Sequence, residues 1–569
     1  MSTLTPEELE ERLGDPADDA NPYGFAAAVA RDERDEFPEA LHAELVAAGF
    51  HLNYLPKSWG GTLESFDRSL TLVRSAARRD VNVMPATMFS IIAATCLQLH
   101  GSAAQQRRAA EILCAGGAVA FALTEAGHGS ELLANEVRLT DGVLTGEKWM
   151  VGLGLRCDAV YVVARTGERG PGAFTAVLLE TAGVPAGLLE RVPAPRTDGM
   201  RGIDLATLRF HGTPVPSGAL VGRAGEALEA AVKAQQAVRL MSMAGSLGVA
   251  DSAVRIALDF AATRRTGRTT LAASPHPRRE LAVGAAALLA ADAVALSAAR
   301  GVHVVPESFS VWALAAKHVV AEATDDLIRR CGTVLATRSV LRERAPGAGL
   351  FQKLRRDSAV IRVIDASTLA NLRSYAGQLP TLTEGAGRPD PAALEAVFTL
   401  DAGLPEYDPA RLDMFARGAD PVLAGLPDAA AEAAGALGAA GPPVRRLTEA
   451  VAGLGELTRA AREPGADPNA LVDAAERYAW LHAAACCLHL WSANRDRSLY
   501  GTEPGSTGWL GAVLGYLLAR ADGTDPRRHG ELLTPALDAV LELRDSHRLF
   551  TALPVRLAPP TGPATPRGA

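Results

Sequence analysis

Polar residues that could bind a ligand follow directly on an apolar run in the stretch AFALTEAGHGSE. Thr124 and Glu125 end the run, Gly127 and Gly129 open the loop after it, and Ser130 follows. The end of a strand presents backbone N–H and C=O groups, a threonine hydroxyl adds another hydrogen-bonding group, and glycine lets a ligand approach the backbone closely. The stretch is therefore either a platform for a planar ligand or a surface turn with a serine cap.

A second group of residues that could do chemistry lies in the stretch YAWLHAAACCLHLWS. Helical spacing puts His482, Cys486 and His489 on one face of a helix. Imidazole and thiolate groups are typical zinc ligands, but a fourth ligand is not evident in the sequence. The pattern favours a buried apolar face with hydrogen-bonded histidines, and we predict no metal site.

The periodicity of apolar residues divides the chain into the elements that must position these residues. Residues 1–117 have helical spacing, residues 118–224 consist of short β-like runs separated by Gly, Pro and Asp, and residues 225–382 return to long alanine-rich helical patterns. After a Pro/Gly-rich linker, residues 390–555 are helical again. We predict an α+β protein with an N-terminal helical domain, a central β-barrel or β-sandwich domain, a C-terminal helical bundle and an appended helical domain.

Composition and charge narrow the class of protein. The chain of 569 residues has a net charge of −8 and no basic stripe, which argues against a nucleic-acid binder. Its six cysteines are scattered without a disulfide framework, and the acidic start MSTLTPEELEERLGDPADD lacks the pattern of a signal peptide. The apolar stretch Leu281–Ala299 contains Asp292 and favours a buried helix, whereas RSAARRD favours a solvated face or ion pairs. We predict a cytoplasmic protein in a reducing compartment.

The order of several motifs resembles that of the acyl-CoA dehydrogenase family over about residues 35–380. In chain order they are YLPKSWGGT, GSAAQ running into LTEAGHGSE, TGEKWM, GMRGIDLATLRFHGTPVPSGALVG and RRD. They are similar to the family's Pro-x-x-x-Gly-Gly turn, to its Gly-(Ser/Thr)-x-x-Gln stretch running into Thr-Glu-x-x-x-Gly-Ser-Asp, and to its Asn-Gly-x-Lys-x-Trp strand. The last two are similar to its joint of Gly-x-Arg-Gly, Val-Pro and Leu-x-Gly and to its Arg-Asp pair. Each motif is weak alone, whereas the set in this order is a specific indication of the fold.

The resemblance implies that the chain binds FAD, with the flavin ring against the corner between Thr124 and Ser130. It therefore favours the platform over the surface turn. Arg264 matches the arginine that reaches the pyrophosphate, and Arg239 would support the substrate or the active-site loop. Ser130 would also contact the substrate. The residues implied to hold the cofactor are Phe121, Leu123, Thr124, Ser130, Trp149 and Arg264.

The reaction that the resemblance implies is α,β-dehydrogenation of an acyl thioester. A base of raised pKa removes the α-proton while hydride leaves the β-carbon. The family's base is a glutamate, and an ungapped count from the Arg356–Asp357 pair puts Asp365 at its position. Asp365 is either this base, one methylene shorter, or an ordinary helix residue facing water or an arginine. The other helix on which family members carry a base has Val238 at that position, so no second base is visible.

The sequence departs from the family pattern at the cofactor site. The family's Trp-x-Thr falls on Met150, Val151 and Gly152, so the threonine that contacts the flavin in the family is replaced by Gly152. The family's adenine-binding Phe and Gln fall on Gly267 and Pro275. One glycine, Gly332, remains of its Gly-Gly-x-Gly stretch. Three interpretations follow: an unusual FAD-dependent dehydrogenase, a catalytically degenerate copy that keeps the fold, and a flavin monooxygenase on the same fold.

The resemblance also implies an assembly and partners. Family members form dimers or tetramers, so we expect a homo-oligomer. A degenerate copy would instead form a hetero-oligomer with an active paralogue. The acyl chain, its carrier (coenzyme A or acyl-carrier protein) and the electron acceptor (electron-transfer flavoprotein or oxygen) stay open. We expect an FAD-dependent acyl-thioester dehydrogenase in which Asp365 is the catalytic base.

Overall fold

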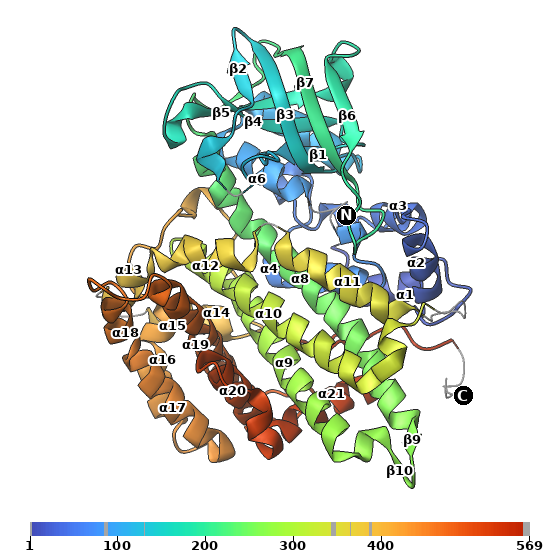
Figure 1. Cartoon of the computed structure of the whole chain (residues 1–569), viewed down its shortest axis with the longest axis vertical. Coiled ribbons are helices and arrows are strands. Elements are labelled where there is room, and N and C mark those ends of the chain that lie inside the picture. The colour runs from blue at the N-terminus through green and yellow to red at the C-terminus, as the bar shows by residue number, and fades with distance from the viewer. Residues whose placement is uncertain are drawn as a thin grey trace.

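The computed structural model describes residues 3–84, 89–129, 131–342, 349–364, 366–385 and 390–561. Figure 1 shows the sheet at one end of the molecule, with helices from the rest of the chain packed together below it. The chain changes from helix to strand at Val119 and back to helix at Ala227. The predicted order of helical, β and helical regions is confirmed.

The N-terminal helices lie beside the sheet and the long helices. They are α1 (Pro6–Leu13), α2 (Phe25–Asp32), α3 (Glu39–Ala47), α4 (Phe66–Ala77), α6 (Ser90–His100) and α7 (Ala103–Cys114). The stretch GSAAQ starts α7 with a capping box, in which Ser102 and Gln105 each accept a backbone N–H from the other residue. The Gln105 amide also donates to the carbonyls of Gly218 and Leu220, at 2.9 and 2.8 Å. This motif thus joins the helical region to the sheet.

Replacing Gln105 by alanine should lower the free energy of unfolding by about 1–2 kcal/mol. The change removes half of the capping box and leaves the two carbonyls of the sheet segment without their donor. Thermal and denaturant unfolding of purified variants measures the effect. Gln106→Ala is the matched control, because Gln106 is half-buried and donates only to the carbonyl of Gly101 within the described contacts. Equal stability of the Gln105 and Gln106 variants would contradict the expected role of Gln105 in joining α7 to the sheet.

The central region is a single eight-stranded sheet. Its strands are β1 (Val119–Ala122), β2 (Arg138–Thr140), β3 (Val143–Gly152), β4 (Ala159–Arg165), β5 (Phe174–Glu180), β6 (Leu189–Pro193), β7 (Leu205–Pro214) and β8 (Leu220–Val221). The strand order is β6-β7-β3-β2-β4-β5-β8, and β1 pairs in parallel with β4. The sheet has two ends, so it is open rather than a closed barrel. It has a small apolar core of its own, to which Val137, Leu144, Val160 and Phe210 belong.

The helical bundle follows the sheet. It consists of α8 (Ala227–Thr263), α9 (Pro275–Val304), α10 (Phe309–Leu335), α11 (Leu350–Val363), α12 (Thr368–Ala376) and α13 (Leu379–Glu384). Within the described residues, α9 is the one helix long and apolar enough to cross a membrane, and its most apolar window is wholly buried in the protein. Asp292 in this helix accepts a hydrogen bond from Arg74 at 2.6 Å. The helix therefore serves as a core element, as its sequence predicted.

The C-terminal region consists mainly of helices that cover the bundle. They are α14 (Pro391–Phe398), α15 (Pro421–Ala424), α16 (Leu426–Ala433), α17 (Gly441–Ala452), α18 (Leu454–Ala460), α19 (Ala470–Ala493), α20 (Gly508–Ala521) and α21 (Thr534–Asp545). Helices α19 and α20 pack against α9, and α19 also packs against α10. One hydrophobic core runs from Leu9 through the bundle to Ala552. The N-terminal, bundle and C-terminal helices share this core, so the core does not mark where one domain ends and the next begins. The predicted domain limits 1–117, 118–224, 225–382 and 390–555 therefore stay predictions.

Candidate functional site

The residues after β1 form a corner that the neighbouring segments hold in place. The Leu123 carbonyl accepts hydrogen bonds from Asn135 Nδ2 at 2.7 Å and from Lys148 Nζ at 2.9 Å. The Thr124 carbonyl accepts the Trp149 N–H at 2.8 Å. The Leu123 side chain is buried in the core, whereas Thr124 is half-buried. Leu123 therefore offers a ligand at most its backbone, and Thr124 offers its side chain.

A buried ion pair fixes this corner, and the sequence did not predict it. Glu125 Oε1 accepts from Lys148 Nζ at 2.7 Å, and the Glu125 carboxylate also accepts the backbone N–H groups of Glu136 and Val137. Burial lowers the pKa of Lys148 to about 8, although Glu125 opposes this shift. The two motif residues, the Glu of LTEAG and the Lys of TGEKWM, thus hold the corner rather than face a ligand.

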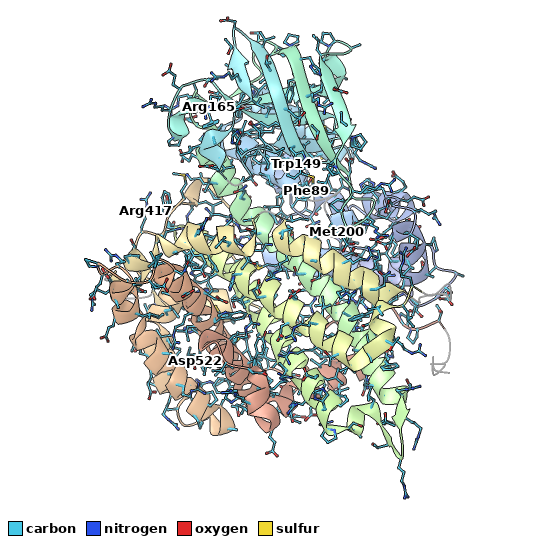
Figure 2. All side chains as sticks on the ribbon, in the orientation of Figure 1. Phe89, Trp149, Arg165, Met200, Arg417 and Asp522 are labelled. Atoms are coloured by element: carbon cyan, nitrogen blue, oxygen red, sulfur yellow. The ribbon has the colours of Figure 1, made fainter. Side chains whose placement is uncertain are left out.

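A β-bulge in β3 brings Trp149 to the corner. Lys148 pairs with Leu208 on β7 but Val151 pairs with Ala206, so Trp149 and Met150 together oppose one residue. Met150 has a φ of 53°, a left-handed conformation that is uncommon for a residue with a side chain. Figure 2 shows Trp149 at the edge of the sheet that faces the helices. The structure therefore unites three of the predicted cofactor residues: Leu123, Thr124 and Trp149.

Phe121 and the loop glycines lie around this corner. The half-buried Phe121 ring stacks on Tyr161, with the ring centroids 5.7 Å apart. A side chain at Gly127 or Gly129 would have no atom within 4 Å of its Cβ, so the loop backbone is open on this side. Ser130 lies outside the described residues. The corner can thus present an aromatic ring, a hydroxyl and an indole to a planar ligand.

The structure does not bring the predicted Arg264 of the same chain to this corner. Arg264 is exposed at the C-terminal end of α8, which has 37 residues and is therefore roughly 55 Å long. Figure 1 places the β9–β10 hairpin (Arg265–Thr266 and Thr269–Thr270), directly after Arg264, at the end of the molecule opposite the sheet. Arg239 is buried in the N-terminal half of α8. A contact between Arg264 and a ligand at the corner would require a second copy of the chain.

Asp365 lies outside the described residues, between α11 and α12. Helix α10 holds both sides of this link. Lys317 donates to the Ile361 carbonyl at 3.1 Å, which places a cation at the C-terminal end of α11. Glu322 accepts from Arg362 at 2.9 Å and from the Thr368 hydroxyl at 2.8 Å.

The joint GMRG is fixed on α11 by the aspartate of RRD. Asp357 accepts the Met200 N–H at 2.6 Å and pairs with Lys353 at 2.7 Å. A Cβ at Gly199 would lie 2.1 Å from the backbone of Arg356, so only glycine permits this approach. These contacts join the sheet to the helix that precedes Asp365.

The departures at Gly267 and Pro275 have local structural reasons. Gly267 has a φ of 62° in the turn of the β9–β10 hairpin, a conformation that suits glycine. Pro275 is the first residue of α9, where proline costs no hydrogen bond. Gly332 lies inside α10, and Val334 and Leu335 after it are buried.

The histidine and cysteine face of α19 makes contacts within the protein. His482 Nδ1 lies 2.6 Å from Asp420 Oδ2, and its Nε2 lies 3.5 Å from Cys486 Sγ. His489 Nε2 lies 3.0 Å from the Val422 carbonyl. Burial would lower the pKa of His482, but Cys486 and Asp420 outweigh it and raise that pKa well above its usual value. Within the described residues, no group of three or more His, Cys, Asp or Glu side chains is arranged so that it could hold a metal ion.

Family models of the acyl-CoA dehydrogenases match the chain in three consecutive segments. The N-terminal domain matches residues 23–117, the middle domain residues 120–213 and the C-terminal domain residues 226–367. These matches cover more than half of the 569 residues. The middle-domain match contains Phe121, Thr124 and Trp149.

Named relatives resemble parts of the chain. It is 31% identical over 241 residues to the probable acyl-CoA dehydrogenase FadE10 of Mycobacterium tuberculosis, a match that covers 40% of this chain and 36% of that protein. The chain therefore matches little more than a third of that relative's length. It is 27% identical over 350 residues to the mitochondrial isobutyryl-CoA dehydrogenase of Bos taurus, covering 59% of this chain and 80% of the relative.

Solved structures share the fold at low sequence identity. An acyl-CoA dehydrogenase complexed with FAD from Bacillus anthracis has a TM-score of 0.64 at 17% identity, covering 96% of this chain and 98% of that one. Butyryl-CoA dehydrogenase from Megasphaera elsdenii has a TM-score of 0.59 at 20% identity, covering 67% and 99%. A prolyl acyl carrier protein oxidase, AnaB, has a TM-score of 0.55 at 16% identity, covering 61% and 92%. With all three family domains matched in order, the chain belongs to the acyl-CoA dehydrogenase family.

Proposed function

We propose that this chain is an FAD-dependent dehydrogenase that introduces an α,β double bond into an acyl thioester. The observation that carries the proposal is the corner at which the β3 bulge joins Trp149 to Thr124 by a backbone hydrogen bond of 2.8 Å. Phe121, Thr124 and Trp149 are each half-buried there and the loop beside them is open, which fits a planar ring.

The residues of the corner would hold and orient FAD. Phe121, the Leu123 backbone, Thr124 and Trp149 would contact the ring system, with Ser130 beside them. Arg264 of a second copy would pair with the pyrophosphate, which makes a homodimer or larger homo-oligomer part of the proposal. When bound, FAD supplies the acceptor for the hydride that leaves the β-carbon.

Asp365 would take the α-proton, and Arg239 would support the substrate or the active-site loop. Lys317 and Glu322 favour this assignment, because they hold the helix ends on both sides of Asp365. Proton transfer requires a base in a defined position, and fixed helix ends before and after residue 365 are consistent with that requirement. The solved relatives act on thioesters of two kinds by their names, coenzyme A and acyl-carrier protein, and we propose that the carrier here is one of them. The proposed location is the cytoplasm, with electron-transfer flavoprotein or oxygen as the electron acceptor.

A second candidate function is that of a catalytically silent subunit, which would pair with an active paralogue. It is favoured by the bulky buried Val334 and Leu335 beside the single remaining glycine Gly332. A close backbone approach to phosphates is harder where such side chains fill the space.

The visible absorption spectrum of the purified chain, with and without added FAD, distinguishes the two functions. The dehydrogenase requires a flavin band that co-elutes with the protein and bleaches when an acyl thioester is added without oxygen. A colourless chain that does not bind added FAD would contradict the proposed dehydrogenase function and support the silent subunit. A chain that binds FAD but does not bleach with coenzyme A or carrier-protein thioesters would contradict the reaction alone, leaving the monooxygenase interpretation.

Arg264→Ala should weaken FAD binding about 10-fold or more. The expected cause is the loss of a charge-assisted hydrogen bond to a phosphate, worth about 1.5–3 kcal/mol. Titration of the apoprotein with FAD, followed by flavin fluorescence, measures the affinity. Arg462→Ala makes the same change of charge at an exposed arginine paired with Glu384 and should leave the affinity unchanged. Equal affinity of the Arg264 variant and wild type would rule out the cofactor role.

A further inference from the structure

Gly152, the last residue of β3, lies directly against the ring of Phe89. A Cβ added at Gly152 would lie 2.0 Å from Phe89 Cδ2, 2.4 Å from Cε2 and 2.7 Å from Cγ. The atom positions leave no room for any side chain at this position. Figure 2 labels Phe89 and Trp149 in the part of the molecule where the sheet meets the helices.

Space rather than backbone conformation makes glycine necessary here. Gly152 is absent from the residues with positive φ, so its backbone conformation is open to any amino acid. At Gly127 and Gly129, in contrast, an added Cβ meets nothing within 4 Å. Gly152 is therefore one half of a matched pair, which we call the Phe89–Gly152 pair.

The pair lies at the end of β3, three residues after Trp149. Val151, the residue before Gly152, belongs to the sheet's own core, and the half-buried Phe89 packs against that core as well. Helix α6 packs against β1, and Ser90 Oγ accepts the Val119 N–H at 3.0 Å, which fixes the backbone beside Phe89. The ring is thus held between α6 and the strand that carries the Trp149 bulge.

We propose that Phe89 forms a wall of the flavin site and that Gly152 provides the space for its ring. This inference rests on the proposed function and adds a positioning residue to it. A planar ring bound at Thr124 and Trp149 is bounded by the aromatic side chain of Phe89 on the Gly152 side. Aromatic rings in contact stabilise one another and fix their relative position. The glycine that departs from the family pattern is thereby compensated by a ring from another segment.

A double-mutant cycle tests the wall. Phe89→Ala should weaken FAD binding roughly 3- to 10-fold, the range expected for one lost aromatic contact, and should shift the flavin absorption maximum. Gly152→Ala should weaken FAD binding by a similar factor, because the added methyl group displaces the Phe89 ring. The double variant should be no weaker than either single variant, since the ring is then already absent. Phe89→Leu keeps the apolar packing against the sheet and should retain the fold while losing the aromatic contact.

Phe25→Ala is the matched control, because Phe25 is also a half-buried aromatic residue and lies at the start of α2, away from the residues proposed to hold FAD. Its FAD affinity should equal that of wild type. Unchanged affinity in Phe89→Ala, or additive losses in the double variant, would overturn the wall while leaving the proposed function intact. Tighter FAD binding by Phe89→Ala would also overturn it, because the ring would then occupy the place of the flavin. A wild-type chain that ignores FAD overturns the proposed function and, with it, the wall.

Discussion

Asp365→Asn is expected to lower turnover of an acyl thioester by a factor of about a hundred to ten thousand, the contribution of a general base. The amide has nearly the shape of the carboxylate but cannot take up the α-proton. FAD binding should be unchanged, because the residues proposed to hold the ring come from the sheet. Anaerobic single-turnover reduction of the bound flavin measures the chemical step, and the absorbance of the purified variant measures its flavin content.

The matched control for this variant is Asp325→Asn. Asp325 belongs to α10 and lies 3.5 Å from Arg362, so its replacement removes a carboxylate near the α11–α12 link without touching the proposed base. Its turnover should stay close to that of wild type. Asp365→Glu should keep turnover, because a carboxylate remains and glutamate is the family's usual base. Full turnover by Asp365→Asn would contradict the assignment of Asp365 as the catalytic base.

Helical and strand periodicity sufficed to predict the regions of the fold, because apolar spacing records which face of each element is buried. The residue pattern left the corner at Thr124 as either a ligand platform or a surface turn, and only the order of the motifs favoured the platform. The geometry of this corner depends on the β-bulge, which inserts one extra residue at Trp149 and Met150. The spacing of apolar residues does not indicate such a bulge. The Glu125–Lys148 pair escaped prediction for a related reason, since its two residues lie 23 positions apart and meet only when β3 folds beside the corner.

The arginines of RSAARRD show a different limit. The sequence favoured a solvated face or ion pairs, and the structure has the ion pairs without the solvated face, because Arg74, Arg78 and Arg79 are all buried. Their partners include Asp251 and Asp292, which lie far away in the sequence. Charged residues at helical spacing usually indicate a surface, and only the tertiary packing of α4, α8 and α9 reverses that expectation.

Asp251→Asn is expected to lower the free energy of unfolding by about 3–5 kcal/mol, the cost of removing one partner of a buried ion pair. Asp251 Oδ1 accepts from Arg78 Nε at 2.9 Å and from Arg255 Nε at 2.8 Å, and Oδ2 accepts the Phe550 N–H at 3.1 Å. The amide that replaces it carries no negative charge among these buried arginines. Thermal unfolding at neutral pH measures the loss of stability. Asp538→Asn is the control, because Asp538 belongs to an exposed ion pair with Arg278.

The Asp251 carboxylate also makes the difference in stability between wild type and Asp251→Asn depend on pH. Burial alone would raise the pKa of Asp251, but Arg255, Arg78 and Arg74 outweigh it and hold that pKa well below the ordinary carboxyl value. A group with a lowered folded-state pKa stabilises the protein above its unfolded pKa of about 3.9, and this contribution is lost as the pH falls through the folded pKa. The stability gap between wild type and Asp251→Asn should therefore be full at pH 7 and should narrow only below about pH 4. A constant gap down to pH 2 would contradict the ionised pairing.

Local release of the C-terminal segment should accompany the loss of stability. Asp251 holds the Phe550 N–H, Arg74 Nη2 donates to the Phe550 carbonyl at 2.7 Å, and Asp292 accepts the Ala552 N–H at 3.0 Å. These bonds tie the segment after α21 to α4, α8 and α9, so Asp251 is one of three buried side chains that couple this segment to the core. Asp251→Asn should make the backbone near Phe550 more susceptible to limited proteolysis than the Asp538→Asn control. A variant that loses stability with the segment equally protected would show that the arginines, and not the tether, carry the effect.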